Sequence, residues 1–210
     1  MRVLVTGGAG YVGSAVVHAL CDAGHVVDIQ DNLSAGRHEF VDRRCKRFFN
    51  EDLDYPRTWR IPHDVVIHLA ARCVIGDTLH GPDEYWRTNV MGTFNIAISG
   101  QEKIVFASSA AVYGDDENAP PVKPIREDCT PRPISCYGCT KLAAEQMLSD
   151  MASHDQIGVV ILRLFNVAGA MPEHDLGEWH DPETRLISRM LRDRHVTIYD
   201  GGLSHALDCS

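Results

Sequence analysis

The stretch that decides the fold is Thr6-Gly7-Gly8-Ala9-Gly10-Tyr11-Val12-Gly13, which directly follows the apolar run Arg2-Val3-Leu4-Val5. The glycines at positions 7, 10 and 13 permit a tight turn from strand to helix and a close approach of the backbone to a pyrophosphate. A helix beginning near Tyr11 would direct its N-terminal amides and its dipole at that anion. The stretch therefore predicts a dinucleotide-binding turn, although glycine-rich turns also join strands to helices for packing alone.

An acidic residue follows at the position that such a turn requires. The second apolar run, Val26–Gln30, ends at Asp31, which lies 18 residues beyond Gly13. A carboxylate there is expected to meet the adenine ribose hydroxyls, so Asp31 favours NAD over NADP as the cofactor. The competing interpretation is that an aspartate before Asn32 merely holds a turn.

The composition is that of a globular domain. Of the 210 residues, 44% are hydrophobic and 23% are charged, and no apolar stretch approaches the roughly 20 residues that span a bilayer. The net charge of -9, without a long basic run, argues against nucleic acid or an anionic membrane as a partner. Because no signal peptide precedes the first strand, we expect a cytoplasmic protein.

The seven cysteines are an odd number and are scattered along the chain, so we expect free thiols. Cys136 and Cys139 form a Cys-x-x-Cys pair. No second pair of matching spacing completes a tetrahedral zinc site, and no metal site is predicted.

Short runs rich in β-branched residues alternate with longer segments of helical periodicity, a pattern typical of a parallel sheet covered on both faces. The predicted fold class is therefore α/β, a Rossmann-type doubly wound parallel sheet. The predicted strands are 3–5, 26–30, 47–49, 65–69, 104–107 and 159–162, and the predicted helices are 11–23, 82–99 and 137–153.

Two further segments complete the expected organisation. The segment 115–133 contains five prolines and is expected to be a loop over the carboxyl edge of the sheet, where ligands bind in open α/β folds. Beyond position 170 the pattern predicts a loop over 171–181, a helix over 182–192 and a short strand over 195–199, and positions 200–210 give no clear signal.

A serine at a strand end and a tyrosine–lysine pair on the next helix suggest chemistry. Ser109 follows the predicted strand 104–107, and Tyr137 and Lys141 lie on one face of the helix that begins 28 residues beyond Ser109. An ammonium beside a phenol lowers its pKa from about 10 toward neutrality, so the tyrosine can act as a general base. Tyr-x-x-x-Lys alone is common on helix surfaces, but its coupling to a cofactor turn and to a serine favours catalysis.

These motifs together resemble the extended short-chain dehydrogenase/reductase family and, within it, the UDP-glucose 4-epimerases. The resemblance covers nearly the whole chain. The segments that carry it are 6–14, 31–36, 68–71, 89–93, 108–114, 137–141 and 163–170. Ala110 and Ala111 stand where related sugar-nucleotide dehydratases place an acid, so dehydration would lack its proton donor.

The resemblance implies NAD-dependent 4-epimerisation of a UDP-sugar, UDP-galactose or UDP-glucose, through a transient 4-keto intermediate. Tyr137 would take the proton of the sugar 4-hydroxyl, and Lys141 would lower the pKa of Tyr137 and bind the nicotinamide ribose. Ser109 would hydrogen-bond the sugar oxygen. The hydride would leave C4 for NAD and return to the other face of the sugar.

The cofactor contacts that the resemblance implies run through most of its motifs. They are Gly7, Gly10, Tyr11, Val12 and Gly13 at the pyrophosphate, Asp31, Asn32, Leu33, Ser34, Ala35 and Gly36 around the adenosine ribose, Asp52 and Leu53 near the adenine, Leu69, Ala70, Ala71 and Asn89 along the groove, and Phe165 with Tyr137 and Lys141 near the nicotinamide. The sugar nucleotide would meet Ser109, Tyr137 and Asn166. Asn89 could instead bridge structurally, and Phe165 could belong to the core.

Three departures from the family pattern bear on these expectations. Cys73 stands where many of these epimerases have lysine or serine, and Leu164 where tyrosine is usual. Family members are also much longer than 210 residues, and their later part supplies much of the uridine and diphosphate binding. We therefore expect an NAD-binding domain over 1–170 and the start of a substrate-binding lobe over 171–210. A homodimer is a further expectation.

Two alternatives to the main interpretation stay open. The substrate could be another nucleotide sugar, N-acetylated or uronic, because part of the sugar-selecting surface lies outside these motifs. Alternatively, the chain could be a truncated, non-catalytic NAD-binding protein. The intact Ser109, Tyr137 and Lys141 argue against the latter, and the early stop argues for it.

Overall fold

The structure is a computed structural model that describes residues 1–54, 61–73, 81–114, 124–154, 157–171, 174, 176–177, 195–200 and 203–208. Its elements in chain order are β1 (Arg2–Thr6), α1 (Tyr11–Asp22), β2 (Val26–Asp31), η1 (His38–Phe40), β3 (Arg47–Asn50), β4 (Val65–His68), α2 (Pro82–Trp86), η3 (Arg87–Met91), α3 (Gly92–Ala97), β5 (Lys103–Ser109), η4 (Ala110–Val112), α4 (Cys136–Ser153), β6 (Gly158–Leu164), β7 (His195–Asp200) and β8 (Leu203–Asp208).

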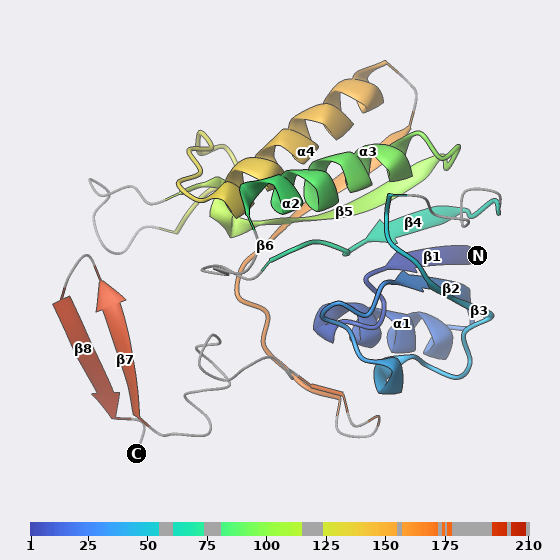
Figure 1. The fold of residues 1–210 in the computed structure, drawn as a ribbon, viewed down its shortest axis with the longest axis horizontal. Helices are drawn as coiled ribbons and strands as arrows, with labels where there is room; N and C mark the ends of the chain where they lie inside the picture. Colours follow the sequence, from blue (N-terminus) through green and yellow to red (C-terminus); the bar gives the residue numbers. More distant parts are fainter. Residues whose placement is uncertain are drawn as a thin grey trace. The chain divides into compact units, whose positions relative to one another are not determined.

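Six of the strands form one parallel sheet in the order β3-β2-β1-β4-β5-β6 (Figure 1). Figure 1 shows α1 on one side of this sheet and α2, α3 and α4 on the other. The strand order and the two helical layers are those of a Rossmann-type, doubly wound fold. The predicted fold class is therefore confirmed.

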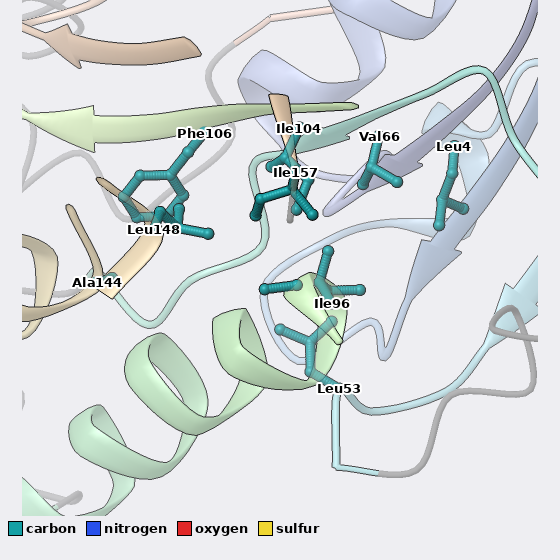
Figure 2. Close-up of a cluster of buried hydrophobic side chains, with 10 residues drawn as sticks. Leu4, Leu53, Val66, Ile96, Ile104, Phe106, Ala144, Leu148 and Ile157 are labelled. Atoms are coloured by element: carbon teal, nitrogen blue, oxygen red, sulfur yellow. The ribbon is translucent and has the colours of Figure 1, made fainter. Parts of the chain in front are cut away.

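Alternating side chains of the strands fill two separate cores. Val3 and Val5 of β1 pack with Val17 of α1 on one face, whereas Leu4 lies in the cluster on the other face. Figure 2 shows this second cluster, in which Ile96 of α3 and Leu148 of α4 meet side chains from the strands. This period of two explains why the inner strands are apolar on both faces.

Each of the six predicted strands of the sheet is present, with slightly different ends. The strand predicted to stop at Ala107 continues through Ser109, because Ser109 still pairs with Leu164 of β6. Ser109 is thus the last residue of β5 and does not lie in the loop that follows.

The helix predicted over 82–99 is not a regular α-helix. A π-helical turn, η3, separates α2 from α3. The carbonyl oxygen of Asn89 in η3 accepts a hydrogen bond from Thr93 Oγ1 of α3 at 2.6 Å, and the side chain of Asn89 bonds to groups outside the helix. π-turns of this kind occur frequently at functional sites.

The chain divides into two compact units, Met1–Asn166 and Val167–Ser210. In the second unit β7 and β8 pair antiparallel, with His195 opposite Asp208. The strand predicted over 195–199 is present, but β8 was not predicted. The sequence does carry a signal for it, because Gly201-Gly202, the two residues between the strands, is a typical two-residue hairpin connection.

Several predictions concern segments outside the described residues. These are the helix over 182–192 and parts of the loops over 115–133 and 171–181. The described part of the first loop, from position 124 to 133, contains no helix or strand. Among the described helices none is long and apolar enough to cross a membrane.

Candidate functional site

The glycine turn connects β1 to α1 at the carboxyl edge of the sheet. Gly7 has a φ of +72°, and a Cβ there would lie 2.7 Å from the amide nitrogen of Ala70. A Cβ on Gly13 would overlap the carbonyl oxygen of Gly7. Neither position has room for a side chain, so the turn depends on glycine.

The start of α1 is open to an anion. Its N-cap residue is Gly10, and no side chain accepts the capping hydrogen bond. Helix N-termini leave amide groups that require an acceptor, and a phosphate is a suitable one. Tyr11, Val12 and Gly13 form this first turn of α1. Their contacts with a pyrophosphate stay a prediction.

Asp31 ends β2 and lies beside the glycine turn. Its carboxylate accepts hydrogen bonds from the amides of Ala9 at 3.0 Å and Leu33 at 2.8 Å, and the residue is 8% exposed. Burial raises the pKa of Asp31, and the two backbone bonds oppose that effect. The turn-holding alternative is thus real. It does not exclude a ribose contact, because a carboxylate has about four acceptor sites.

The segment after Asp31 is fastened to the same turn. The amide of Arg37 donates to the carbonyl of Ala9 at 2.9 Å, and a Cβ on Gly36 would lie 3.0 Å from the same oxygen. The amide of Ser34 donates to Asn32 Oδ1, and Ala35 is exposed. The predicted ribose-binding segment therefore lies against the glycine turn.

The two residues predicted near the adenine differ. Asp52 Oδ2 accepts a 3.3 Å bond from Asn32 Nδ2, which brings it to the predicted ribose segment. Leu53 is buried in the core. Its side chain packs on Gly92 so closely that a Cβ at Gly92 would collide with it. The amide of Leu53 donates to Asp52 Oδ1 at 2.7 Å and its carbonyl oxygen accepts from Asn95 Nδ2 at 3.0 Å, and its side chain belongs to the core.

The residues after β4 lie beside the glycine turn. The amide of Leu69 donates to the carbonyl oxygen of Thr6 at 3.1 Å, and Ala70 N donates to Thr6 Oγ1 at 3.3 Å. Leu69, Ala70 and the partly buried Ala71 therefore follow directly alongside β1 and its turn.

Asn89 is a structural bridge. It is buried, its Oδ1 accepts from Arg72 N at 2.8 Å, and its Nδ2 donates to Arg72 O and Thr140 Oγ1, each at 3.0 Å. These bonds join the loop after β4 to α4. The alternative weighed for Asn89, a bridging role, is what its side chain does here.

Lys141 and Tyr137 lie on successive turns of α4. Lys141 is 2% exposed, and its Nζ donates to the carbonyl of Ala107 at 2.7 Å and lies 5.9 Å from the centre of the Tyr137 ring. Burial lowers the pKa of Lys141 to about 8, opposed by Cys73 and Glu145. Lys141 is therefore no surface lysine, while Tyr137 is partly buried. The catalytic role of the pair stays a prediction.

Ser109 lies next to the start of this helix. Its Oγ accepts the amide of Ala111 at 3.2 Å and so caps η4. A Cβ on Gly138 would lie 2.5 Å from the carbonyl oxygen of Ala111, so the first turn of α4 packs closely on η4. The structure thus brings the segments of Ser109, Tyr137 and Lys141 together at one edge of the sheet.

Phe165 and Asn166 follow β6 at the same edge. Phe165 is 58% exposed, with its ring 6.5 Å from that of Tyr113, and Asn166 is also exposed. Phe165 is thus no core residue. Exposed positions beyond a strand end are accessible to a ligand.

Buried polar residues that the sequence analysis did not select surround these groups. His68 bonds Thr6 Oγ1 through Nδ1 at 2.6 Å and Thr93 Oγ1 through Nε2 at 2.9 Å. Burial, together with the charge of Lys141, lowers the pKa of His68 to about 3. The sequence signal that could have identified His68 is a polar residue within an otherwise apolar strand.

The two cysteines that flank Tyr137 bond in different directions. Cys136 Sγ donates to Pro82 O at 4.0 Å, and Cys139 Sγ donates to Pro133 O at 3.9 Å. Burial and the neighbouring Cys139 raise the pKa of Cys136. Within the described residues there is no group of three or more side chains suited to hold a metal ion.

The chain matches known proteins over nearly its whole length. The sequence pattern of the NAD dependent epimerase/dehydratase family matches residues 3–205. A UDP-glucose 4-epimerase of Azospirillum brasilense is 42% identical over 196 residues, which are 89% of this chain and 55% of the relative. The chain thus spans a little over half the length of the curated relatives it matches.

Solved structures agree with this assignment. UDP-glucose 4-epimerase from Brucella ovis in complex with NAD is 38% identical, with a TM-score of 0.80 over 90% of this chain and 59% of that one. UDP-N-acetylglucosamine 4-epimerase from Methanobrevibacter ruminantium is 30% identical, with a TM-score of 0.77 over 90% and 61%. The protein, with its glycine turn and its buried lysine at the carboxyl edge, belongs to the NAD-dependent epimerase/dehydratase family.

Proposed function

We propose that this chain is the NAD-binding part of a UDP-sugar 4-epimerase that interconverts UDP-galactose and UDP-glucose. One observation carries the proposal: Lys141 is buried on the first turns of α4, with its ammonium tied to Ala107 and facing Tyr137. A buried lysine costs free energy, and such groups gather at catalytic sites. On this proposal residues 1–170 bind NAD, and residues 171–210 begin the substrate lobe.

The glycine turn fits a dinucleotide. Gly7 and Gly13 leave no room for a Cβ, and the N-cap of α1 has no side chain, so a pyrophosphate can approach the backbone. The carboxylate of Asp31 would accept hydrogen bonds from the adenosine ribose hydroxyls. When bound, NAD supplies a reversible acceptor for the C4 hydride of the sugar, so the reaction involves no net oxidation.

Tyr137 is the proposed general base and acid. As a phenolate it takes the proton of the sugar 4-hydroxyl, and it returns that proton once the 4-keto sugar has turned over in the site. The charge of Lys141 favours the phenolate. Only one of the three ammonium protons of Lys141 is used by Ala107, so the others can reach Tyr137 and the nicotinamide ribose.

Ser109, Phe165 and Asn166 position the substrate in this proposal. The hydroxyl of Ser109 accepts a bond from Ala111, so its own proton can be donated to the sugar oxygen. Phe165 would cover the nicotinamide, and Asn166 would bond the sugar nucleotide. Both are exposed beyond the end of β6.

The experiment is to incubate the 210-residue protein with NAD and UDP-galactose and to measure UDP-glucose by chromatography. Tyr137→Phe is the matched control, since it removes one hydroxyl and leaves the ring. We expect conversion by the wild type that is lost in Tyr137→Phe, with the Kd for NAD unchanged. Equal conversion by both proteins would refute the role of Tyr137.

Two other candidates are tested alongside. The similarity to a UDP-N-acetylglucosamine 4-epimerase supports a different nucleotide sugar, so UDP-N-acetylglucosamine and UDP-glucuronate are assayed in parallel. The other candidate is a non-catalytic NAD-binding protein. NAD binding without conversion of any of these sugars would favour that candidate. A cytoplasmic location and a homodimer stay predictions.

A further inference from the structure

Glu145 is a buried carboxylate one helical turn beyond Lys141. It is 4% exposed, and Ser108 Oγ donates a short hydrogen bond to its Oε1. Arg163 donates from Nε to Oε1 at 3.0 Å and from Nη2 to Oε2 at 2.7 Å. The carboxylate is thus held by a two-pronged ion pair and a hydroxyl.

These bonds fasten α4 to the two strands that carry the proposed chemistry. On β5, Ala107 accepts the ammonium of Lys141 and Ser108 binds Glu145, and the next residue is Ser109. Arg163 of β6 is the register partner of Ser108. Helix and strands are therefore locked together one residue before Ser109.

Arg163 also extends the network toward the end of β6. Its guanidinium carbon lies 4.8 Å from the centre of the Tyr113 ring, and that ring packs with Phe165. The hydrogen bonds to Glu145 raise the pKa of Arg163, so its positive charge is permanent. One connected set of contacts therefore runs from Lys141 to the proposed nicotinamide side of the site.

The charge of Lys141 depends on few groups. Burial lowers the pKa of Lys141, whereas the nearby Cys73 and Glu145 raise it. Of its other titratable neighbours, His68 is kept neutral because burial and Lys141 depress its pKa, and the Tyr137 ring faces the ammonium. Glu145 is the carboxylate among them, so it is the group whose removal would uncover the cost of burying the ammonium.

We infer that Glu145, held by Arg163 and Ser108, is a positioning residue that keeps Lys141 charged and fixes α4 against the end of β5. The inference rests on the proposed function, in which the charge of Lys141 supports the Tyr137 phenolate. A buried ion pair is weak evidence for stability alone, because hydrophobic residues of similar volume often stabilise as well. Control of a neighbouring charge is a role that such residues cannot fill.

The test is the titration of the Lys141 ammonium, followed by NMR on protein labelled at the lysine side chain, without NAD or sugar. In Glu145→Gln we expect the pKa of Lys141 to fall by about one unit or more, because the shape is kept and the charge is lost. Glu102→Gln, the same change at an exposed position, should leave the titration of Lys141 unchanged. An unchanged titration in Glu145→Gln would overturn the inference.

A double variant separates charge from folding. Glu145→Gln/Arg163→Met removes both charges, so no buried charge is left unpaired and the fold should be recovered if the single variant is destabilised. We still expect Lys141 to titrate below its wild-type value. Recovery of the wild-type titration in the double variant would show that the Glu145–Arg163 pair exerts no net control on the charge of Lys141, against the inference.

Activity distinguishes this inference from the proposed function. If the wild type is an epimerase, the high-pH limb of kcat/KM should move to lower pH in Glu145→Gln by the same amount as the Lys141 titration. If the wild type converts no sugar while Lys141 still shifts, the proposed function fails and the control of Lys141 by Glu145 stands.

Discussion

The two ends of the parallel sheet both bury charge, but they do so in different ways. At the carboxyl end, Lys141 bonds a carbonyl and Glu145 is held by a hydroxyl and a guanidinium. At the amino end, Asp28 is buried with His63 Nε2 at 3.0 Å and Arg2 Nε at 3.5 Å, and its Oδ1 has no hydrogen-bond partner among the described residues.

This difference indicates different roles for the two ends of the sheet. Directed hydrogen bonds fix the groups of the carboxyl end in orientations that a reaction can use. The amino-end cluster is less completely satisfied, and removing one of its members leaves further buried polar groups without a hydrogen-bond partner. We therefore expect substitutions at the carboxyl end to affect chemistry and substitutions at the amino end to affect folding.

The strongest way to break this comparison is Lys141→Met. We expect turnover to fall on the order of 100-fold or more, because the phenolate loses its stabilising charge. The free energy of unfolding should stay the same or rise, since a buried ammonium is replaced by an apolar chain of similar length. Kinetics and urea denaturation measure the two effects. A large loss of stability would place Lys141 with the structural charges of the amino end.

Asp28→Asn should show the reverse pattern. It removes the charge that Arg2 and the His63 imidazole share, so we expect the free energy of unfolding to fall by about 1–3 kcal/mol. The Kd for NAD, measured where the protein is still folded, should not change. Asp150→Asn, at an exposed position of α4, is the control and should change stability by less than about 1 kcal/mol. A loss of NAD affinity in Asp28→Asn would contradict the division between the two ends.

Gly13→Ala sharpens the comparison within the carboxyl end. Its Cβ would overlap the carbonyl of Gly7, so the turn must shift and NAD affinity should fall at least about tenfold, or 1.4 kcal/mol. Gly24→Ala is the control for adding a methyl group, because a Cβ at Gly24 would meet open space, although Gly24 has a φ of +78°. It should cost about 1 kcal/mol of stability without affecting NAD. Equal losses of NAD affinity in Gly13→Ala and Gly24→Ala would contradict the role of the glycine turn in NAD binding.

The smallest expected effect is a pH dependence. Burial holds the pKa of His68 at about 3, and it also lowers that of His63. The unfolded chain, with ordinary histidine pKa values near 6.5, binds more protons below that pH, so stability is complete above pH 6.5 and falls toward pH 3. The slope is at most about 1.4 kcal/mol per pH unit for each histidine.

His68→Gln tests that slope at the carboxyl end. The variant should show a shallower fall in the free energy of unfolding between pH 6.5 and pH 5 than the wild type, by urea denaturation at each pH. The comparison is a substitution of His18, which lies on α1 and is partly buried beside Asp42. Identical slopes for wild type and His68→Gln would mean that His68 is not neutral in the folded protein.

Local patterns carried most of the fold and much of the candidate site. The alternation of apolar runs and helical segments predicted every strand of the sheet, and the glycine spacing predicted the turn after β1. Tyr137 and Lys141 were found because helical periodicity places residues four apart on one face. Each of these signals lies within a short window of sequence.

The tertiary structure decided what depends on contacts between distant segments. The partners of Glu145 are Ser108 and Arg163, which stand 37 and 18 residues away. Asn89 proved to be a bridge to Arg72 and Thr140. The sequence by itself determined which residues form strands, turn and helices, because those preferences are local. Only the packed sheet determined which buried charges meet, because the energy of a buried charge depends on neighbours that the chain brings together by folding.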